Sequence, residues 1–132
     1  MSPALVLDAG ALIALDRNDR SAWALLRVAA DEGAIVQVPA GVIAQAWRNG
    51  GRQVLLSRAL RHCDEVPLDG LGARAAGLLC GQTRTSDVID ATVALAASAL
   101  DRAGDVTVVT SDPDDIRRLT EALRVEVRLQ RP

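Results

Sequence analysis

Four aspartates occupy positions from which folding would gather their carboxylates. Asp8 ends the aliphatic run ALVLD, and Asp112 follows the run DVTVVT after one serine. Asp87 and Asp90 open the otherwise apolar segment TSDVIDATVALAA with i, i+3 spacing, which points both toward one side of a helix. Like charges at short range are unfavourable unless a cation lies among them, and oxygen-only ligands select Mg²⁺ or Mn²⁺. The expected chemistry is phosphodiester hydrolysis, because such a metal generates hydroxide and neutralises charge on phosphoryl oxygens.

The elements that must position these residues alternate between strand and helix patterns. This alternation predicts a single domain over residues 1–132, a three-layer α/β/α sandwich with a mostly parallel central sheet. Sites in such sheets lie beyond the carboxyl ends of the strands, so Asp8 and Asp112 should emerge at the same edge. The expected strands are 4–8, 34–39, 64–69, 105–110 and 125–130. The expected helices are 9–33 (broken near 17–21), 40–51, 52–63, 70–81, 86–104 (closed by Gly104) and 112–124.

The paired aspartates have two readings. Ser86 or Asp87 is the expected N-cap of its helix, and a carboxylate near a helix N-terminus contributes about 0.3–1 kcal/mol through the helix dipole alone. A capping role explains the aspartate at position 87 at least as well as a role in the metal-dependent site does. It explains Asp90 less well, because Asp90 directly precedes the apolar run ATVALAA, where burial of an unpaired charge is costly.

Composition limits the other functions. The net charge of −2 and the pI of about 5.3 lack the basic footprint of a nucleic-acid-binding domain. All 15 basic residues are arginines, a bias that base composition of the genome explains better than phosphate binding does. Two cysteines without a disulfide or zinc spacing, and no export or membrane-spanning segment, predict a cytoplasmic protein. The best-placed phosphate contacts are Arg48, Arg52 and Arg84, for each of which a solvated surface role is equally expected.

Four segments, in order and over nearly the whole chain, resemble the motifs of PIN-domain ribonucleases, in particular VapC-type toxins: LVLDAGALIAL, VPAGVIAQAWR, TSDVIDATVALAA and VVTSDPDDIRRL. The resemblance implies a Mg²⁺- or Mn²⁺-dependent endoribonuclease of a toxin–antitoxin pair, with RNA as substrate and a cognate VapB-type antitoxin as partner. By motif position Asp8, Asp90 and Asp112 are the metal-binding acids, and Asp115 is an acid that orients the site. Thr110 and Ser111 either donate hydrogen bonds to Asp112 or to a phosphate, or simply form a turn.

The chain departs from the family at its second acid, a glutamate that falls here on Gln45. An amide coordinates metal through its carbonyl oxygen but removes one negative charge, so weaker metal binding, or a single well-held metal, is expected. Asp87 is the candidate to replace that charge. The alternative is a catalytically impaired PIN-like protein that binds RNA or antitoxin without cleaving. A receiver-type phospho-acceptor domain would need a lysine after a late strand, and the chain has no lysine.

Assembly is a further expectation. The helical segments RAAGLLCG and VALAASAL carry more apolar side chains than the two faces of a small sheet require. We therefore expect part of this surface to form a subunit contact in a homodimer, as in the resembling family, although a compact core would also absorb it.

Overall fold

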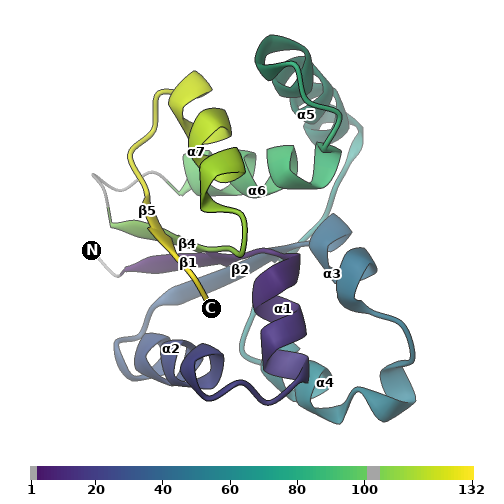
Figure 1. The fold of residues 1–132 in the computed structure, drawn as a ribbon, viewed down its shortest axis with the longest axis vertical. Coiled ribbons are helices and arrows are strands. Elements are labelled where there is room, and N and C mark those ends of the chain that lie inside the picture. The colour runs from purple at the N-terminus through teal and green to yellow at the C-terminus, as the bar shows by residue number, and fades with distance from the viewer. Residues whose placement is uncertain (1–2, 101–104) are drawn as a thin grey trace.

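A parallel five-stranded sheet lies between two layers of helices in the computed structural model, which describes residues 3–100 and 105–132 (Figure 1). The strand order is β3-β2-β1-β4-β5. Helices α1, α2 and α4 lie on one side of the sheet, and α5, α6 and α7 lie on the other. The strands are β1 (Ala4–Leu7), β2 (Ile35–Pro39), β3 (Asp64–Val66), β4 (Val106–Val109) and β5 (Arg128–Gln130). The predicted three-layer α/β/α fold is confirmed.

Side chains cap most of the helices. Asp8, Asp19, Asp69 and Asp87 are the N-caps of α1, α2, α5 and α6, and each carboxylate accepts a hydrogen bond from a backbone N–H of the first turn. No described helix has the length and apolar character needed to cross a membrane. The helices are α1 (Ala9–Asp16), α2 (Arg20–Asp31), α3 (Ala40–Ala46), α4 (Val54–Leu60), α5 (Gly70–Thr83), α6 (Val88–Ala99) and α7 (Pro113–Ala122), with a 3₁₀ turn η1 (Gly50–Arg52).

The sheet has a topological switch point between β1 and β4. From β1 the chain builds β2 and β3 on one side, then crosses to β4 and β5 on the other. Leu7 pairs with Val109, so the two neighbouring strands end at the same level. Crevices at such points, outside the carboxyl ends of the strands, are the usual ligand sites of open α/β sheets.

The core fills both sides of the sheet. Val6 and Val108 from the central strands are fully buried, as are Leu12 of α1 and Val93 of α6. Each buried aliphatic side chain of this size contributes roughly 1.5–3 kcal/mol relative to exposure. Half of the residues in the run VALAASAL are buried in the core and only Ala99 is exposed, which leaves little of the run for a subunit contact.

Two helix predictions are wrong in detail. The helix expected over 40–51 ends at Ala46, because Trp47 is extended (φ −78°, ψ 121°) and the Gln53 side-chain amide donates to the Ala46 carbonyl. The segment RQVLLSRALRHC predicts an amphipathic helix with Val54, Leu55, Ala59 and Leu60 on or near one face. Ala59 is buried as expected, but Leu56 is fully buried too and Val54 is 59% exposed. The buried face of this short helix is the one that packs on α1, and a short periodic pattern fits more than one face.

Two strands are shorter than predicted. The run 64–69 forms a strand only over Asp64–Val66, because Pro67 has no N–H to continue the ladder. The run 125–130 forms a strand only over Arg128–Gln130, and the Val125 N–H instead bonds the Thr120 carbonyl at the end of α7. The predicted closure at Gly104 lies outside the described residues.

Candidate functional site

Asp8 is a buried carboxylate at the end of β1, with 5% of its surface exposed. Its Oδ1 accepts the Ala11 N–H at 3.0 Å and so caps α1. The Asp8 N–H donates to the Val109 carbonyl, which ties the turn after β1 to the end of β4. The backbone thus fixes this carboxylate at the switch point before any ligand arrives.

The turn after β4 closes over Asp8. The buried Thr110 hydroxyl accepts the Asp112 N–H at 2.9 Å and lies close enough to the Asp8 carboxyl to lower its pKa. Thr110 therefore links the two acids, and its bond to Asp112 is the turn contact rather than a donation to the carboxylate. The Ser111 hydroxyl lies against Gly10, where an added Cβ would overlap it. Glycine at position 10 is what lets the two chain segments approach so closely.

The start of α6 brings the second pair of acids to this edge. Asp87, rather than Ser86, is the N-cap, and its Oδ1 accepts the Asp90 N–H at 2.9 Å. Asp87 is exposed, whereas Asp90 is half-buried in the first turn. Asp87 thus has a demonstrated capping role, which does not by itself test its predicted role in the site.

The start of α7 presents an acid that its own helix does not use. Asp112 is the N-cap of α7 by backbone position, yet its exposed side chain makes no capping hydrogen bond. Asp114 and Asp115 occupy the first turn, and Asp114 pairs with Arg117 at 3.1 Å on the surface. The carboxylate of Asp112 is therefore available to a ligand.

Electrostatics join three of these acids into one group. Burial, and after it the charge of Asp87, raises the pKa of Asp90 from 3.8 to about 7, with smaller contributions from Asp8 and Asp112. Burial also raises the pKa of Asp8, against the hydrogen bonds from Thr110, Ala11 and Ser111 that favour its charged form. Asp8 and Asp112 thus lie near enough to Asp90 for their charges to oppose its ionisation, and their shared role at a metal stays a prediction.

The fit of this group to a divalent cation is incomplete in the protein alone. All its donors are oxygens, and the accumulated negative charge is the environment that Mg²⁺ or Mn²⁺ would relieve. Among residues 3–100 and 105–132, however, no three acidic, histidine or cysteine side chains lie close enough together to hold a metal. The donor set suits a hard cation, and the side chains would have to draw together around it.

Gln45 lies on α3 near the start of α6. It is exposed, one helical turn after Gly41 and so on the same helix face. A Cβ added at Gly41 would meet Cδ1 of Ile89, the residue before Asp90, at 2.5 Å. The face of α3 that carries Gln45 is thus the face turned toward the N-terminal turn of α6.

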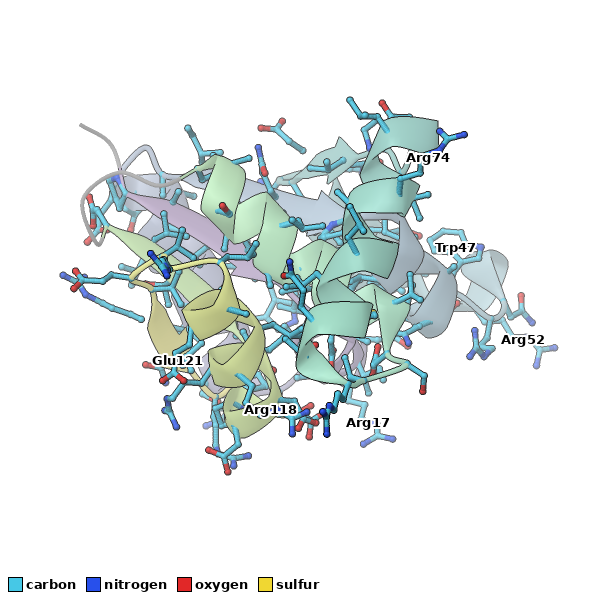
Figure 2. The ribbon with its side chains drawn as sticks, turned by 90° about the horizontal axis from the view of Figure 1, so that it is seen from above. Arg17, Trp47, Arg52, Arg74, Arg118 and Glu121 are labelled. Atoms are coloured by element: carbon cyan, nitrogen blue, oxygen red, sulfur yellow. The ribbon has the colours of Figure 1, made fainter. Side chains whose placement is uncertain are left out.

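The three arginines predicted to contact phosphate differ in whether their side chains already make hydrogen bonds within the protein. The Arg48 guanidinium donates to the carbonyls of Ala44 and Trp47 at 3.0 and 2.9 Å, and so caps the end of α3. Arg52, in η1, projects outward at the end of the molecule that also carries Trp47 (Figure 2). Arg84 is exposed at the end of α5 in a left-handed conformation (φ 56°).

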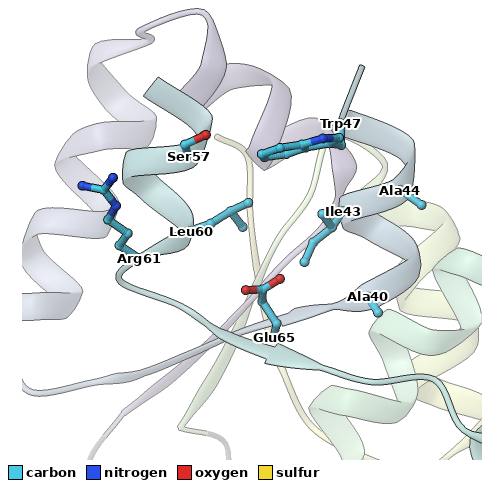
Figure 3. A pocket seen from close by; sticks show the side chains of 8 residues that line it. All are labelled: Ala40, Ile43, Ala44, Trp47, Ser57, Leu60, Arg61 and Glu65. Atoms are coloured by element: carbon cyan, nitrogen blue, oxygen red, sulfur yellow. The ribbon is translucent and has the colours of Figure 1, made fainter. Parts of the chain in front are cut away.

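Sequence reasoning missed an apolar groove between α3 and α4. Trp47, Ile43 and Leu60 point into it, with Glu65 on its floor and Arg61 at its rim (Figure 3). Its volume is about 560 Å³, and Trp47 is 41% exposed. The exposed tryptophan was a usable signal, but the groove requires two helices whose packing the sequence pattern did not define.

Comparison with known proteins identifies the fold. A chain in the crystal structure of VapBC2 from Rickettsia felis, bound to a DNA fragment from their promoter, superposes with a TM-score of 0.65 and 15% sequence identity. The match covers 96% of this chain and 98% of that chain. No protein-family model matches the sequence, and no curated protein gives a significant match. At this identity the likeness establishes a shared fold across the whole chain.

Proposed function

We propose that this chain is a metal-dependent endoribonuclease and the toxin of a toxin–antitoxin pair. The observation that carries the proposal is that Asp8 and Asp112 follow the neighbouring strands β1 and β4 at the switch point, with Asp90 near enough for their charges to contribute to its raised pKa of about 7. Perturbed acids at such a crevice are typical of functional sites. The fold shared with a chain of VapBC2 supports the same assignment.

The residues of the chain have distinct roles in this proposal. Asp8, Asp90 and Asp112 would hold Mg²⁺ or Mn²⁺, which supplies hydroxide and neutralises charge on the scissile phosphate. Asp8 is oriented by the Ala11 N–H and the Thr110 hydroxyl. The same hydroxyl also accepts the Asp112 N–H and so positions Asp112, which means that one hydroxyl helps to set the spacing of two acids.

The proposed partner is a VapB-type antitoxin. Its support is that a structural neighbour is part of a VapBC2 complex, and that the groove lined by Trp47, Ile43 and Leu60 offers an exposed apolar surface to an incoming segment. A self-associated form of the chain, a homodimer, is also proposed, with α5 as its contact. In α5, Leu71 and Leu78 are 79% and 72% exposed.

Thermal unfolding with and without Mn²⁺ tests the metal site, read beside cleavage of a single-stranded RNA. A ligand at a hundredfold excess over its Kd stabilises the folded state by about 2.7 kcal/mol. Asp8→Asn should abolish both the stabilisation and the cleavage. Asparagine still accepts the capping hydrogen bond, so the fold should survive.

Asp19→Asn is the matched control, because Asp19 caps α2 through an identical 3.0 Å bond to the Ala22 N–H. This variant should keep the full response to Mn²⁺. An equal thermal shift in the wild type and Asp8→Asn would refute the placement of the metal.

A second candidate is a catalytically impaired protein that binds RNA or antitoxin without cleaving. Two observations favour it: the neutral Gln45, and the absence of three metal-holding side chains within reach of one another among the described residues. RNA binding without any Mn²⁺-dependent cleavage would select this candidate over the first.

A further inference from the structure

A second pocket lies away from the aspartates, between α2 and α4. Its volume is about 610 Å³, and we call it the arginine pocket because Arg20, Arg27 and Arg58 line it, with Trp23 and Leu55. We propose that the arginine pocket binds the phosphate backbone of single-stranded RNA, holding a part of the strand that is not being cleaved. The choice of RNA rests on the proposed function.

Two helices that are distant in sequence bring the three guanidinium groups together. Arg20 and Arg27 lie two turns apart on the same face of α2, about 10.5 Å along the helix axis. Arg58 comes from α4. Both helices pack against α1, so α1 sets their separation.

Among the residues that the structure describes, no acidic side chain lines the pocket. Among the described residues the ion pairs are Arg117–Asp114 and Arg128–Asp105, so the three pocket arginines have no carboxylate partner there.

The guanidinium groups of these three arginines also make no hydrogen bond within the described part of the chain, unlike those of several other arginines. Arg48, Arg74 and Arg131 each donate to main-chain carbonyls. The guanidinium forks of the pocket are therefore free to bind a ligand. Three unpaired cations around one concavity, on a chain of net charge −2, indicate an anionic ligand rather than an evenly charged surface.

Trp23 makes the wall of the pocket rigid. Its Nε1 donates to the Leu15 carbonyl at 3.0 Å, which fastens α2 to the last turn of α1. The nearest acid in sequence, Asp19, does not line the pocket, and its carboxylate accepts from the Ser21 hydroxyl and the Ala22 N–H. A pre-formed wall lowers the cost of ordering the site when a ligand binds.

The position of the pocket favours RNA over an acidic peptide. Helix α1 starts next to Asp8 and ends at Asp16, and eight residues of helix span about 12 Å. The arginine pocket begins just beyond that end, at Asn18. A strand of a few nucleotides held at the aspartates would therefore reach it.

The test is the salt dependence of RNA binding in EDTA, where cleavage cannot occur. The probe is a short fluorescein-labelled oligouridylate, followed by fluorescence anisotropy. Each single-strand phosphate contact contributes about 0.7 to the slope of log affinity against log salt. The triple variant Arg20→Gln, Arg27→Gln, Arg58→Gln should therefore lower the slope by about 2.

The matched control, Arg74→Gln, Arg117→Gln, Arg128→Gln, removes the same charge elsewhere and should keep the wild-type slope. An equal decrease of the salt slope in both triple variants, or no decrease in the pocket variant, would overturn the assignment. Because the measurement needs no metal, it stands apart from the cleavage assay: a chain that fails to cleave can still pass it, and a cleaving chain can still fail it.

Trp23 provides an independent readout at the pocket. The chain has no tyrosine, and its tryptophans are Trp23 and Trp47, so Trp47→Leu leaves Trp23 as the single fluorophore. Oligouridylate should change its emission, and the change should vanish when the three pocket arginines are replaced. Oligoglutamate is the competing probe: an emission change with oligoglutamate and none with oligouridylate would assign the pocket to an acidic protein segment and refute RNA.

Discussion

Replacing Asp90 by asparagine should remove much of the pH dependence in the stability of the metal-free protein. Burial and the neighbouring acids raise the pKa of this carboxyl to about 7, against 3.8 for a free side chain. Between these two values the folded protein holds a proton that the unfolded chain has released. The stability that this proton provides is therefore complete below about pH 4 and is lost as the pH rises toward 7.

The magnitude follows from the size of the pKa shift. Each pH unit in that window costs about 1.36 kcal/mol for one group that is fully shifted. From about pH 5 to about pH 7 the loss would reach roughly 2.3 kcal/mol, because the folded-state carboxyl is half-ionised at the upper end. Asp90 is only half-buried, and solvent screening reduces the effect to about 1–1.5 kcal/mol. Asparagine cannot ionise, so the stability of the Asp90→Asn variant should not fall by this amount between about pH 5 and about pH 7.

Urea unfolding in EDTA across this pH range measures the effect. The difference between the wild type and Asp90→Asn isolates the Asp90 carboxyl from all other titrating groups. Asp69→Asn is the control, because Asp69 is an exposed N-cap of α5 and this variant should follow the wild type. With Mn²⁺ present the trend should reverse, since protons and metal compete for the same oxygens, and stabilisation by Mn²⁺ should grow with pH.

Two results would refute this reasoning. If the metal-free wild type is equally stable at about pH 5 and about pH 7 relative to Asp90→Asn, burial and the neighbouring acids do not raise the pKa of Asp90 in the folded protein. If Mn²⁺ stabilises equally at both values, the metal does not displace a proton from the acid group.

Three further predictions concern the surroundings of the site. Gln45→Glu should tighten Mn²⁺ binding, as measured by titration calorimetry. The gain in affinity should be larger in an Asp87→Asn background if both side chains serve one metal. Strictly additive effects on affinity would place Asp87 outside the site. Leu71→Gln with Leu78→Gln should shift sedimentation toward the monomer, and a wild type that is already monomeric at micromolar concentration would rule out the α5 contact. Gly10→Ala should cost about 1–3 kcal/mol in urea unfolding through overlap with the turn after β4, and an unchanged midpoint would show that this turn gives way freely.

The sequence by itself determined the order of the elements and the placement of the acids along them. Alternating apolar strands and amphipathic helices require a parallel sheet covered on both faces, and an acid at the end of each central strand must then emerge at one edge. Asp8 and Asp112 were predictable for this reason. Asp87 was predictable as a cap, because its carboxylate needs only the backbone of the next turn. These features depend on local geometry and on chain direction.

Only the tertiary structure decided how the site is held and what lies beside it. Thr110 joins Asp8 to Asp112 because two strands end at the same level, a register that neither strand specifies alone. The arginine pocket exists because α2 and α4 both pack on α1, which brings Arg27 and Arg58 to one concavity across 31 residues of chain. The helix face that turns inward is set by the partner against which the helix packs. The periodicity of a single segment therefore predicts neither the arginine pocket nor the groove beside Trp47.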